Sequence, residues 1–184
     1  MFLKGLMVLN KDILKQQLTE LPLFQYAIFP TEELIFTERV RHICNEECPM
    51  YGKTWACPPA VGTVEECRNK CLAYPEFLLI STVTEVDDIA NMEQTLATRA
   101  DHEAITHEVA ELVKAQGCEI MVLSTEACAI CEECAYPNGP CRFPDEMFPC
   151  VESHGILVTE LCERFGIEFF NGNIVTWFSL IFFR

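Results

Sequence analysis

The stretch Glu76-Phe-Leu-Leu-Ile-Ser-Thr-Val83 holds four apolar residues in a row, and a second apolar run, Cys118-Glu-Ile-Met-Val-Leu123, follows further along the chain. A continuous apolar run of this kind is typical of a strand that is covered on both faces. Between the two runs, apolar residues recur at helical spacing from Ile89 to Leu112, and Gly117 follows as a helix stop. A strand, a long helix and a second strand predict a parallel pair joined by a right-handed crossover.

Two further apolar segments flank this unit. Leu23–Phe29 predicts a strand that ends before Pro30, and Ile174–Phe183, which is dense in β-branched and aromatic residues, predicts another. We therefore expect an α/β fold: a single compact domain with a mixed, partly parallel sheet of about four strands flanked by helices, plus two Cys-rich metal-binding loops. A length of 184 residues fits one domain over residues 1–184.

Polar residues mark the expected ends of several helices. Asn10 is placed to cap a helix near the N-terminus, and Thr84 is placed to cap the long helix. Thr63, with Glu66 three residues later, matches a capping box. A short helix late in the chain is expected to end at Gly166.

The segment after the second strand is Cys128-Ala-Ile-Cys131-Glu-Glu-Cys134-Ala-Tyr-Pro-Asn-Gly-Pro-Cys141. Two-residue gaps let a tight loop point successive sulfurs at one compact object, and the Pro and Gly residues favour a turn that returns the last thiol to it. A loop just past the carboxyl end of a strand is also where open α/β sheets bind ligands. This spacing predicts a [4Fe-4S] cluster on Cys128, Cys131, Cys134 and Cys141, with a zinc knuckle as the alternative.

A second cysteine-rich segment, from Cys44 to Pro59, is irregular and punctuated by Pro and Gly. A bound metal would order such a loop, and Cys44, Cys48 and Cys57 are its three thiols. Three protein thiols on a cubane leave one iron open, and an open iron can polarise a substrate as a Lewis acid. We therefore expect a second metal centre at Cys44, Cys48 and Cys57 that is open and carries the chemistry. Trp55 either shields the metal from water or faces a substrate.

Most other cysteines are expected in the core, because free Cys is among the most buried residue types. Cys118 and Cys162 lie in regular elements. Cys67 and Cys71 share one helix face and could complete the second centre, although helix packing is the favoured role. Cys150 follows the 128–141 loop and is a reserve ligand.

Two histidines on the long helix do not match a zinc protease. His102 and His107 are five positions apart instead of four, so they point in different directions around a helix. We expect that segment to be a solvated helix face.

The composition limits the partners. Lys and Arg number 13 against 28 Asp and Glu, which gives a net charge of −15 and argues against nucleic acid or an anionic membrane. A redox partner protein or a small-molecule substrate remains. Met1–Leu9 lacks the basic region and cleavage site of a signal peptide, and no apolar run reaches the roughly 18 residues of a membrane span. We therefore expect a cytoplasmic location, where 12 reduced cysteines indicate metal binding.

Three segments carry a family resemblance when they are taken together. They are Cys44-x3-Cys48-Pro-x-Tyr51-Gly52-Lys53-x-Trp55-x-Cys57-Pro58-Pro59, then Cys128-x2-Cys131-x2-Cys134 with Gly139-Pro140-Cys141-Arg142-x-Pro144, and finally Glu152-Ser153-His154-Gly155-Ile156. This combination resembles the DUF2284 family of predicted metal-binding, cysteine-rich proteins of unknown function, over about residues 24–183. The resemblance implies an iron–sulfur or other metal site and no defined reaction. Cys150 falls where a small residue is expected in that family.

Three classes of function are compatible with these patterns. The first is an iron–sulfur protein in electron transfer or in redox or Lewis-acid chemistry on a small molecule, which includes an iron–sulfur oxidoreductase. The second is a zinc-stabilised interaction module without turnover. The third is an accessory protein that delivers electrons or metal to a larger enzyme, with its acidic surface docking a basic partner.

Overall fold

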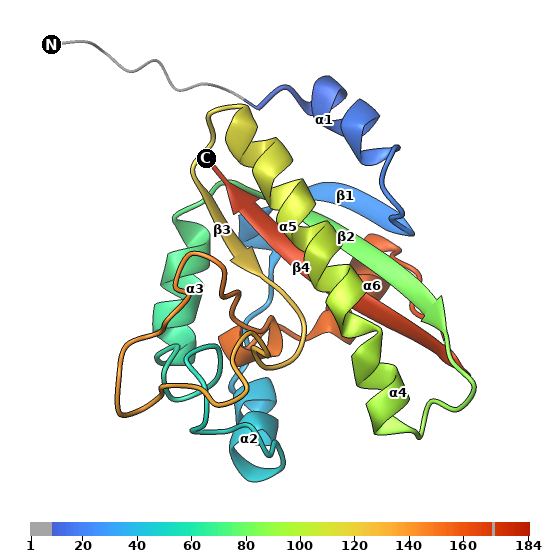
Figure 1. Cartoon of the computed structure of the whole chain (residues 1–184). Helices are drawn as coiled ribbons and strands as arrows, with labels where there is room; N and C mark the ends of the chain where they lie inside the picture. The colour runs from blue at the N-terminus through green and yellow to red at the C-terminus, as the bar shows by residue number, and fades with distance from the viewer. Residues whose placement is uncertain (1–8, 171) are drawn as a thin grey trace, which may run out of the picture.

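The strand Ile174–Phe183 (β4) lies inside the sheet, as the computed structural model in Figure 1 shows for residues 9–170 and 172–184. Within those residues the sheet has four strands in the order β1-β2-β4-β3. The other three are β1 (Gln25–Pro30), β2 (Glu76–Glu85) and β3 (Ile120–Leu123). The structure thus confirms an α/β fold and the positions of all four expected strands.

The expectation of a partly parallel sheet is wrong, because each neighbouring pair of strands is antiparallel. β2 and β3 point the same way, but β4 lies between them and pairs with both. Phe183 is opposite Glu76 on one side and Ile120 on the other. β4 takes this position because its residues from Trp177 to Phe183 are all buried. At an edge, one side of so apolar a strand would expose unpaired backbone N–H and C=O groups.

Helices cover both faces of the sheet, as the apolar runs predict. One face packs on α1 (Lys11–Leu18) and α5 (Arg99–Ala115), and the other packs on α3 (Val64–Leu72) and α6 (Val158–Phe165). Successive side chains of a strand alternate between the faces. The first core includes Leu78, Ile80, Ile181, Leu14, Leu18 and Val109, and the second includes Phe77, Leu79, Phe182, Cys71, Leu161 and Cys162.

The long helix is shorter than expected and is interrupted. Thr84 does not cap it, because β2 continues to Glu85 and Thr84 pairs with Val175 of β4. The Asn91 side chain caps α4 (Met92–Ala97) instead, and α5 follows after Thr98. β-branched residues extend the strand here because they pack well on a pleated surface.

The other predicted helix ends are confirmed. The Asn10 side chain accepts hydrogen bonds from two backbone N–H groups of α1, and Thr63 and Glu66 form the capping box of α3. Gly166 ends α6 with a φ of 64°, a left-handed conformation that suits glycine. The chain also forms α2 (Glu38–Glu46), together with short 3-10 turns at Thr31–Glu33 (η1) and Glu152–His154 (η2).

The expected solvated face on α5 is wrong for His102, which is 1% exposed. Its Nδ1 lies 2.9 Å from the Thr82 hydroxyl and its Nε2 lies 2.8 Å from the Ser179 hydroxyl, so both ring nitrogens have partners inside the protein. Ser179 in turn donates to the Ser124 hydroxyl at 3.0 Å. A buried polar network thus connects the middle of the sheet to the end of β3.

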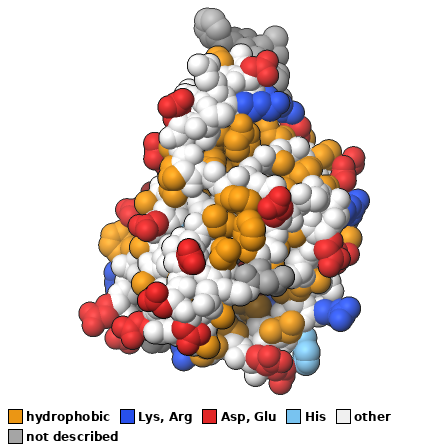
Figure 2. Space-filling model, turned by 90° about the vertical axis from the view of Figure 1, so that its right-hand side faces the viewer, with side chains coloured by type: hydrophobic (Ala, Val, Ile, Leu, Met, Phe, Trp, Pro, Cys, Tyr) orange, Lys and Arg blue, Asp and Glu red, His pale blue; other side chains and the backbone are white. Residues whose placement is uncertain are grey.

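Acidic side chains outnumber basic ones in the chain, 28 to 13. Figure 2 shows carboxylate side chains scattered over one face of the molecule, with hydrophobic side chains between them. Among the helices in the described part of the chain, none is both long and apolar enough to cross a membrane.

Candidate metal centre

Both cysteine loops meet at the carboxyl end of β3. In Figure 1 the segment after β3 and the segment after α2 lie side by side there. Ser124, the first residue beyond β3, forms a parallel bridge with Cys150. The Cys150 backbone N–H donates to the carbonyl oxygen of Ala56 at 3.4 Å. One strand end therefore holds three parts of the chain that are distant in sequence.

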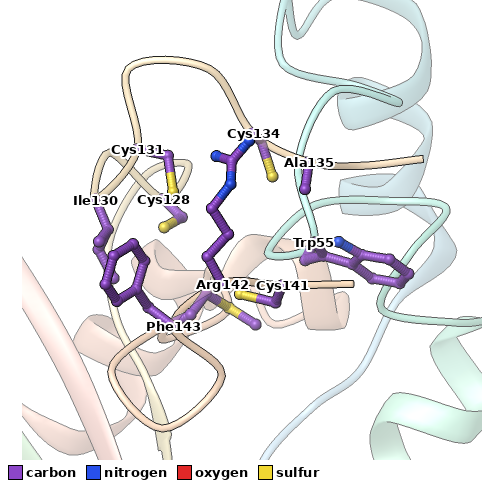
Figure 3. Close-up of a pocket in the computed structure, with 10 residues that line it drawn as sticks. Trp55, Cys128, Ile130, Cys131, Cys134, Ala135, Cys141, Arg142 and Phe143 are labelled. Atoms are coloured by element: carbon purple, nitrogen blue, oxygen red, sulfur yellow. The ribbon is translucent and has the colours of Figure 1, made fainter. Parts of the chain in front are cut away.

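Cys128, Cys131, Cys134 and Cys141 line a single cavity, which we call the 128–141 cavity. Figure 3 shows their four sulfur atoms around one space, with the Arg142 side chain extending between them. All four are free thiols and are partly exposed. The remaining walls are mostly apolar and come from Trp55, Ile130, Ala135, Phe143 and Met147. The structure therefore brings together the four residues that the spacing selected.

Trp55 reaches this cavity from the other cysteine loop. Its Nε1–H donates to the Gly139 carbonyl oxygen at 3.1 Å, and its ring contacts Tyr136 edge-on with centroids 4.9 Å apart. Trp55 is thus a fixed wall of the 128–141 cavity, an arrangement compatible with shielding a metal from water. Lys53 lines an adjoining hollow between the loops, together with Cys128, Cys131 and Cys134.

Cys44, Cys48 and Cys57 line a second cavity, the 44–57 cavity, and they share it with Cys150. Cys44 lies in the last turn of α2, and Cys48 and Cys57 follow in the irregular loop. The other lining residues include two carboxylates, Glu126 and Glu152. The three predicted thiols thus converge, and a fourth joins them from a distant segment.

Cys67 and Cys71 do not line either cavity. Both are fully buried, Cys67 beside the Val61 carbonyl oxygen and Cys71 in the core against β2 and β4. The favoured interpretation of these residues as packing groups agrees with their positions. Cys118 and Cys162 are buried in the core as well.

Burial is the largest influence on the pKa of three lining thiols. It raises the pKa of Cys44, Cys57 and Cys128 above the ordinary value of a thiol. Neighbouring groups oppose it in part, since the Arg41 charge lowers the pKa of Cys44 and a hydrogen bond from Thr54 lowers that of Cys57. A bound cation would act in the same direction and more strongly, because metal binding displaces thiol protons.

Arg41 also fixes the backbone around the 44–57 cavity. Its guanidinium donates to the Gly62 carbonyl oxygen at 2.7 Å and to the Ser153 carbonyl oxygen in η2. Gly155 follows η2 with a φ of 77°, where an added Cβ would lie 2.9 Å from Val64. These contacts explain in physical terms why glycine suits the Glu152–Ile156 segment, and they place that segment beside the cavity.

The two cavities are neighbours. Ala127 lines the 44–57 cavity and the next residue, Cys128, lines the 128–141 cavity. Consecutive Cα atoms are only about 3.8 Å apart. Likewise, Trp55 lines the 128–141 cavity and Cys57, two residues later, lines the 44–57 cavity. Any groups bound in the two cavities would therefore lie close together.

Two carboxylates of the 44–57 cavity are not predicted as parts of a site, Glu126 and Glu152, although Glu152 stands in the third segment of the family resemblance. Cys150, a reserve ligand from the sequence, also lines this cavity. Glu126 adopts a φ of 58°, which is uncommon for a residue other than glycine. Nothing in the sequence indicates that conformation, whereas the short spacing between Cys150 and Glu152 is a signal that could have been used.

The thiols surround hollows and do not form a compact ligand shell. Across residues 9–170 and 172–184, no three Cys, His, Asp or Glu side chains are gathered closely enough to hold a single metal ion. The donor set itself is thiol-rich, and soft thiolates suit iron–sulfur clusters and zinc.

The α/β scaffold and its two cysteine-lined cavities suit a cysteine-rich protein of a predicted metal-binding class. The chain is a member of the DUF2284 family, described as predicted metal-binding protein, whose model matches residues 27–183. The resemblance in the three sequence segments is therefore confirmed. Neither a search of curated proteins nor a search of solved structures found a match.

Proposed function

We propose that this protein is an iron–sulfur protein. Cys128, Cys131, Cys134 and Cys141 would hold one [4Fe-4S] cluster. The observation that carries the proposal is the convergence of these four thiols, three of them at two-residue spacing, on one half-covered cavity. A cubane needs four thiolates around one object, which this arrangement provides.

The walls of the 128–141 cavity favour a cluster over a structural zinc ion. Trp55, Ile130 and Phe143 surround the thiols with apolar surface. Such surroundings limit the access of water to an iron–sulfur cluster and thereby influence its reduction potential. Zinc would need only the thiols, most often as two spaced pairs around a tetrahedron.

A second metal centre is proposed at Cys44, Cys48 and Cys57. The proximity of the two cavities supports electron transfer as the role of the pair. In this role the two centres would exchange electrons with a redox partner protein or with a small-molecule substrate. Redox or Lewis-acid chemistry at the second centre would make the protein an oxidoreductase, and pure transfer would make it an accessory of one.

The remaining parts of the proposal follow from charge and compartment. A net charge of −15 supports a basic protein or a small molecule as the partner and disfavours nucleic acid and anionic membranes. A single domain over residues 1–184 in the reducing cytoplasm is consistent with thiols that bind metal and do not form disulfides.

Anaerobic purification of the full chain tests the proposed function. We expect iron and acid-labile sulfide in equal amounts, about four of each per cluster, and a visible absorbance that bleaches on reduction. A colourless protein that contains zinc and no sulfide would refute the iron–sulfur assignment and would favour the zinc-stabilised module.

A further inference from the structure

We infer that Cys150 is the fourth thiol ligand of the second centre, which is therefore closed. This inference rests on the proposed function, because it concerns the metal proposed at Cys44, Cys48 and Cys57. It replaces the sequence-based expectation of an open iron. Its first support is that Cys150 lines the 44–57 cavity together with all three of those thiols.

The backbone holds Cys150 in place from two sides. Its N–H donates to the carbonyl oxygen of Ala56, the residue before Cys57. Its neighbours Pro149 and Val151 each exchange a 2.9 Å hydrogen bond with the backbone of Ser124 at the end of β3. The segment thus joins the loop that carries Cys57 to the rigid sheet. A metal ligand held in this way needs little ordering when the metal binds.

The side chain of Cys150 is directed by a carboxylate. Its Sγ–H donates to Glu152 Oε2 at 2.8 Å. Metal binding displaces a thiol proton, so Cys150 gives up this hydrogen bond when its sulfur becomes a ligand. Glu152 lines the same cavity and is the rival oxygen ligand. A soft iron–sulfur centre prefers the thiolate to the carboxylate.

The other cysteine candidates have different surroundings. Cys67 lies 3.8 Å from an Arg41 nitrogen and 3.5 Å from the Val61 carbonyl oxygen, and Cys71 packs in the core. Neither lines the 44–57 cavity. Among the cysteines, Cys150 is thus the one that shares a cavity with the trio.

A closed second centre changes the expected chemistry. Four thiolates leave no iron position for a substrate, so Lewis-acid chemistry is disfavoured and electron transfer is favoured. Both centres would then be four-thiolate sites that lie side by side. The protein would act as a two-centre electron relay.

The test uses the full chain, purified anaerobically, with Cys150→Ala and Cys150→Ser compared with the wild type. Cys162→Ala is the matched control, since Cys162 is a buried cysteine of the core outside both cavities. Iron, sulfide and the spectral response to cyanide are measured. Retention of the 128–141 cluster signal and of the far-ultraviolet circular dichroism shows that each variant is folded.

Two results support the inference. The Cys150 variants either lose about half of the iron and sulfide, or they keep both and gain a cyanide response that the wild type and Cys162→Ala lack. Full iron content with a wild-type cyanide response in both Cys150 variants would overturn it. A Glu152→Gln variant that reproduces the effect while the Cys150 variants do not would assign the position to the carboxylate and would also overturn it.

Failure of the inference differs from failure of the proposed function. If the wild type contains zinc and no sulfide, the iron–sulfur assignment fails, and the zinc content of the Cys150 variants still decides the ligand. If Cys57→Ser keeps all of its metal, there is no second centre, and both that centre and the role of Cys150 are refuted while the 128–141 cluster stands.

Discussion

The two cavities differ in how the chain builds them. The 128–141 cavity takes its four thiols from one continuous loop. The 44–57 cavity instead combines Cys44, Cys48 and Cys57 with Cys150, which lies far along the chain. A local ligand set depends on loop geometry alone. A distant one exists only when the sheet has brought its parts together. Spacing in a sequence therefore identifies the first kind of site in full and the second kind only in part.

The cavities also differ in charge. Arg142 extends among the thiols of the 128–141 cavity, while Glu126 and Glu152 line the 44–57 cavity. Positive charge near an iron–sulfur cluster raises its reduction potential and negative charge lowers it. Each cavity also has charge of the opposite sign close by, because Arg41 lies near Cys44 and Glu132 and Glu133 lie between Cys131 and Cys134.

The largest expected effect tests whether the two centres are independent. Cys131→Ser should remove about four irons per chain, because it deletes the central thiol of the 128–141 loop, and the 44–57 centre should remain. Iron and sulfide analysis with electron paramagnetic resonance of the reduced protein measures this. Cys118→Ser, a buried cysteine outside both cavities, is the control and should keep all of its iron. Loss of all the iron from Cys131→Ser would show that the centres are not independent.

Acid should lower the stability of the sheet that carries both cavities, because His102 belongs to a buried hydrogen-bond network that includes Ser124 at the end of β3. Burial lowers the pKa of His102 to about 4, from an ordinary value of 6.5. Below pH 6.5 the unfolded chain binds a proton that the folded protein refuses, so stability falls as the pH drops from about 6.5 to about 4. The total loss from this group is about 3 kcal/mol.

Urea unfolding at several pH values checks this contribution. His102→Gln should have lower stability at neutral pH and a shallower decline toward acid than the wild type. His107→Gln, a change at a partly exposed histidine of the same helix, should keep the steep decline. Equal slopes in all three proteins would contradict the role assigned to His102.

A smaller effect is expected from changes to the apolar walls of the two cavities, measured as the rate of cluster loss in air. Trp55→Ala opens the 128–141 cavity, so that cluster should be lost in air several-fold faster than in the wild type, because solvent access makes clusters labile. Tyr51→Ala changes a lining residue of the 44–57 cavity and is the matched control. Spectra recorded during exposure to air give the two rates. If the 128–141 cluster of Tyr51→Ala bleaches as fast as that of Trp55→Ala, Trp55 does not specifically shield this cluster.

No change in metal content is expected from Cys67→Ala and Cys71→Ala, singly or together. Both side chains fill the core and lie outside the cavities, so their removal should cost about 1 kcal/mol or more of folding free energy and no iron. Metal analysis and urea unfolding measure the two quantities. Iron loss from a folded variant would place one of these thiols in the second centre.

The sequence predicted what depends on short-range patterns. The four strands, the caps at Asn10 and Thr63 and the convergence of the 128–141 thiols all follow from residues that are near one another in the chain. Whether those thiols bind a cluster stays a prediction. The start of the long helix was missed because Thr84 favours both a cap and a strand, and pairing with β4 decided the outcome.

The remaining features depend on contacts between distant segments. Nothing near Ile174–Phe183 specifies that this strand separates β2 from β3. The burial of His102 follows from Thr82 and Ser179, which lie on two different strands. The position of Cys150 follows from its bridge to Ser124. Long-range pairings of this kind are selected by packing and cannot be obtained from spacing in one segment.

The central position of β4 has a consequence for the order of events during synthesis. All 12 cysteines precede residue 174, so a ribosome has already added every thiol before it reaches β4. β3 pairs with β4 among the described strands, and it cannot join the sheet until β4 is available. At about 5–20 residues per second, the interval between Cys128 and Phe183 lasts roughly 3–11 s. The nascent chain therefore carries unassembled thiols for seconds, and loading of the 44–57 centre, whose lining comes from distant segments, should follow translation of β4.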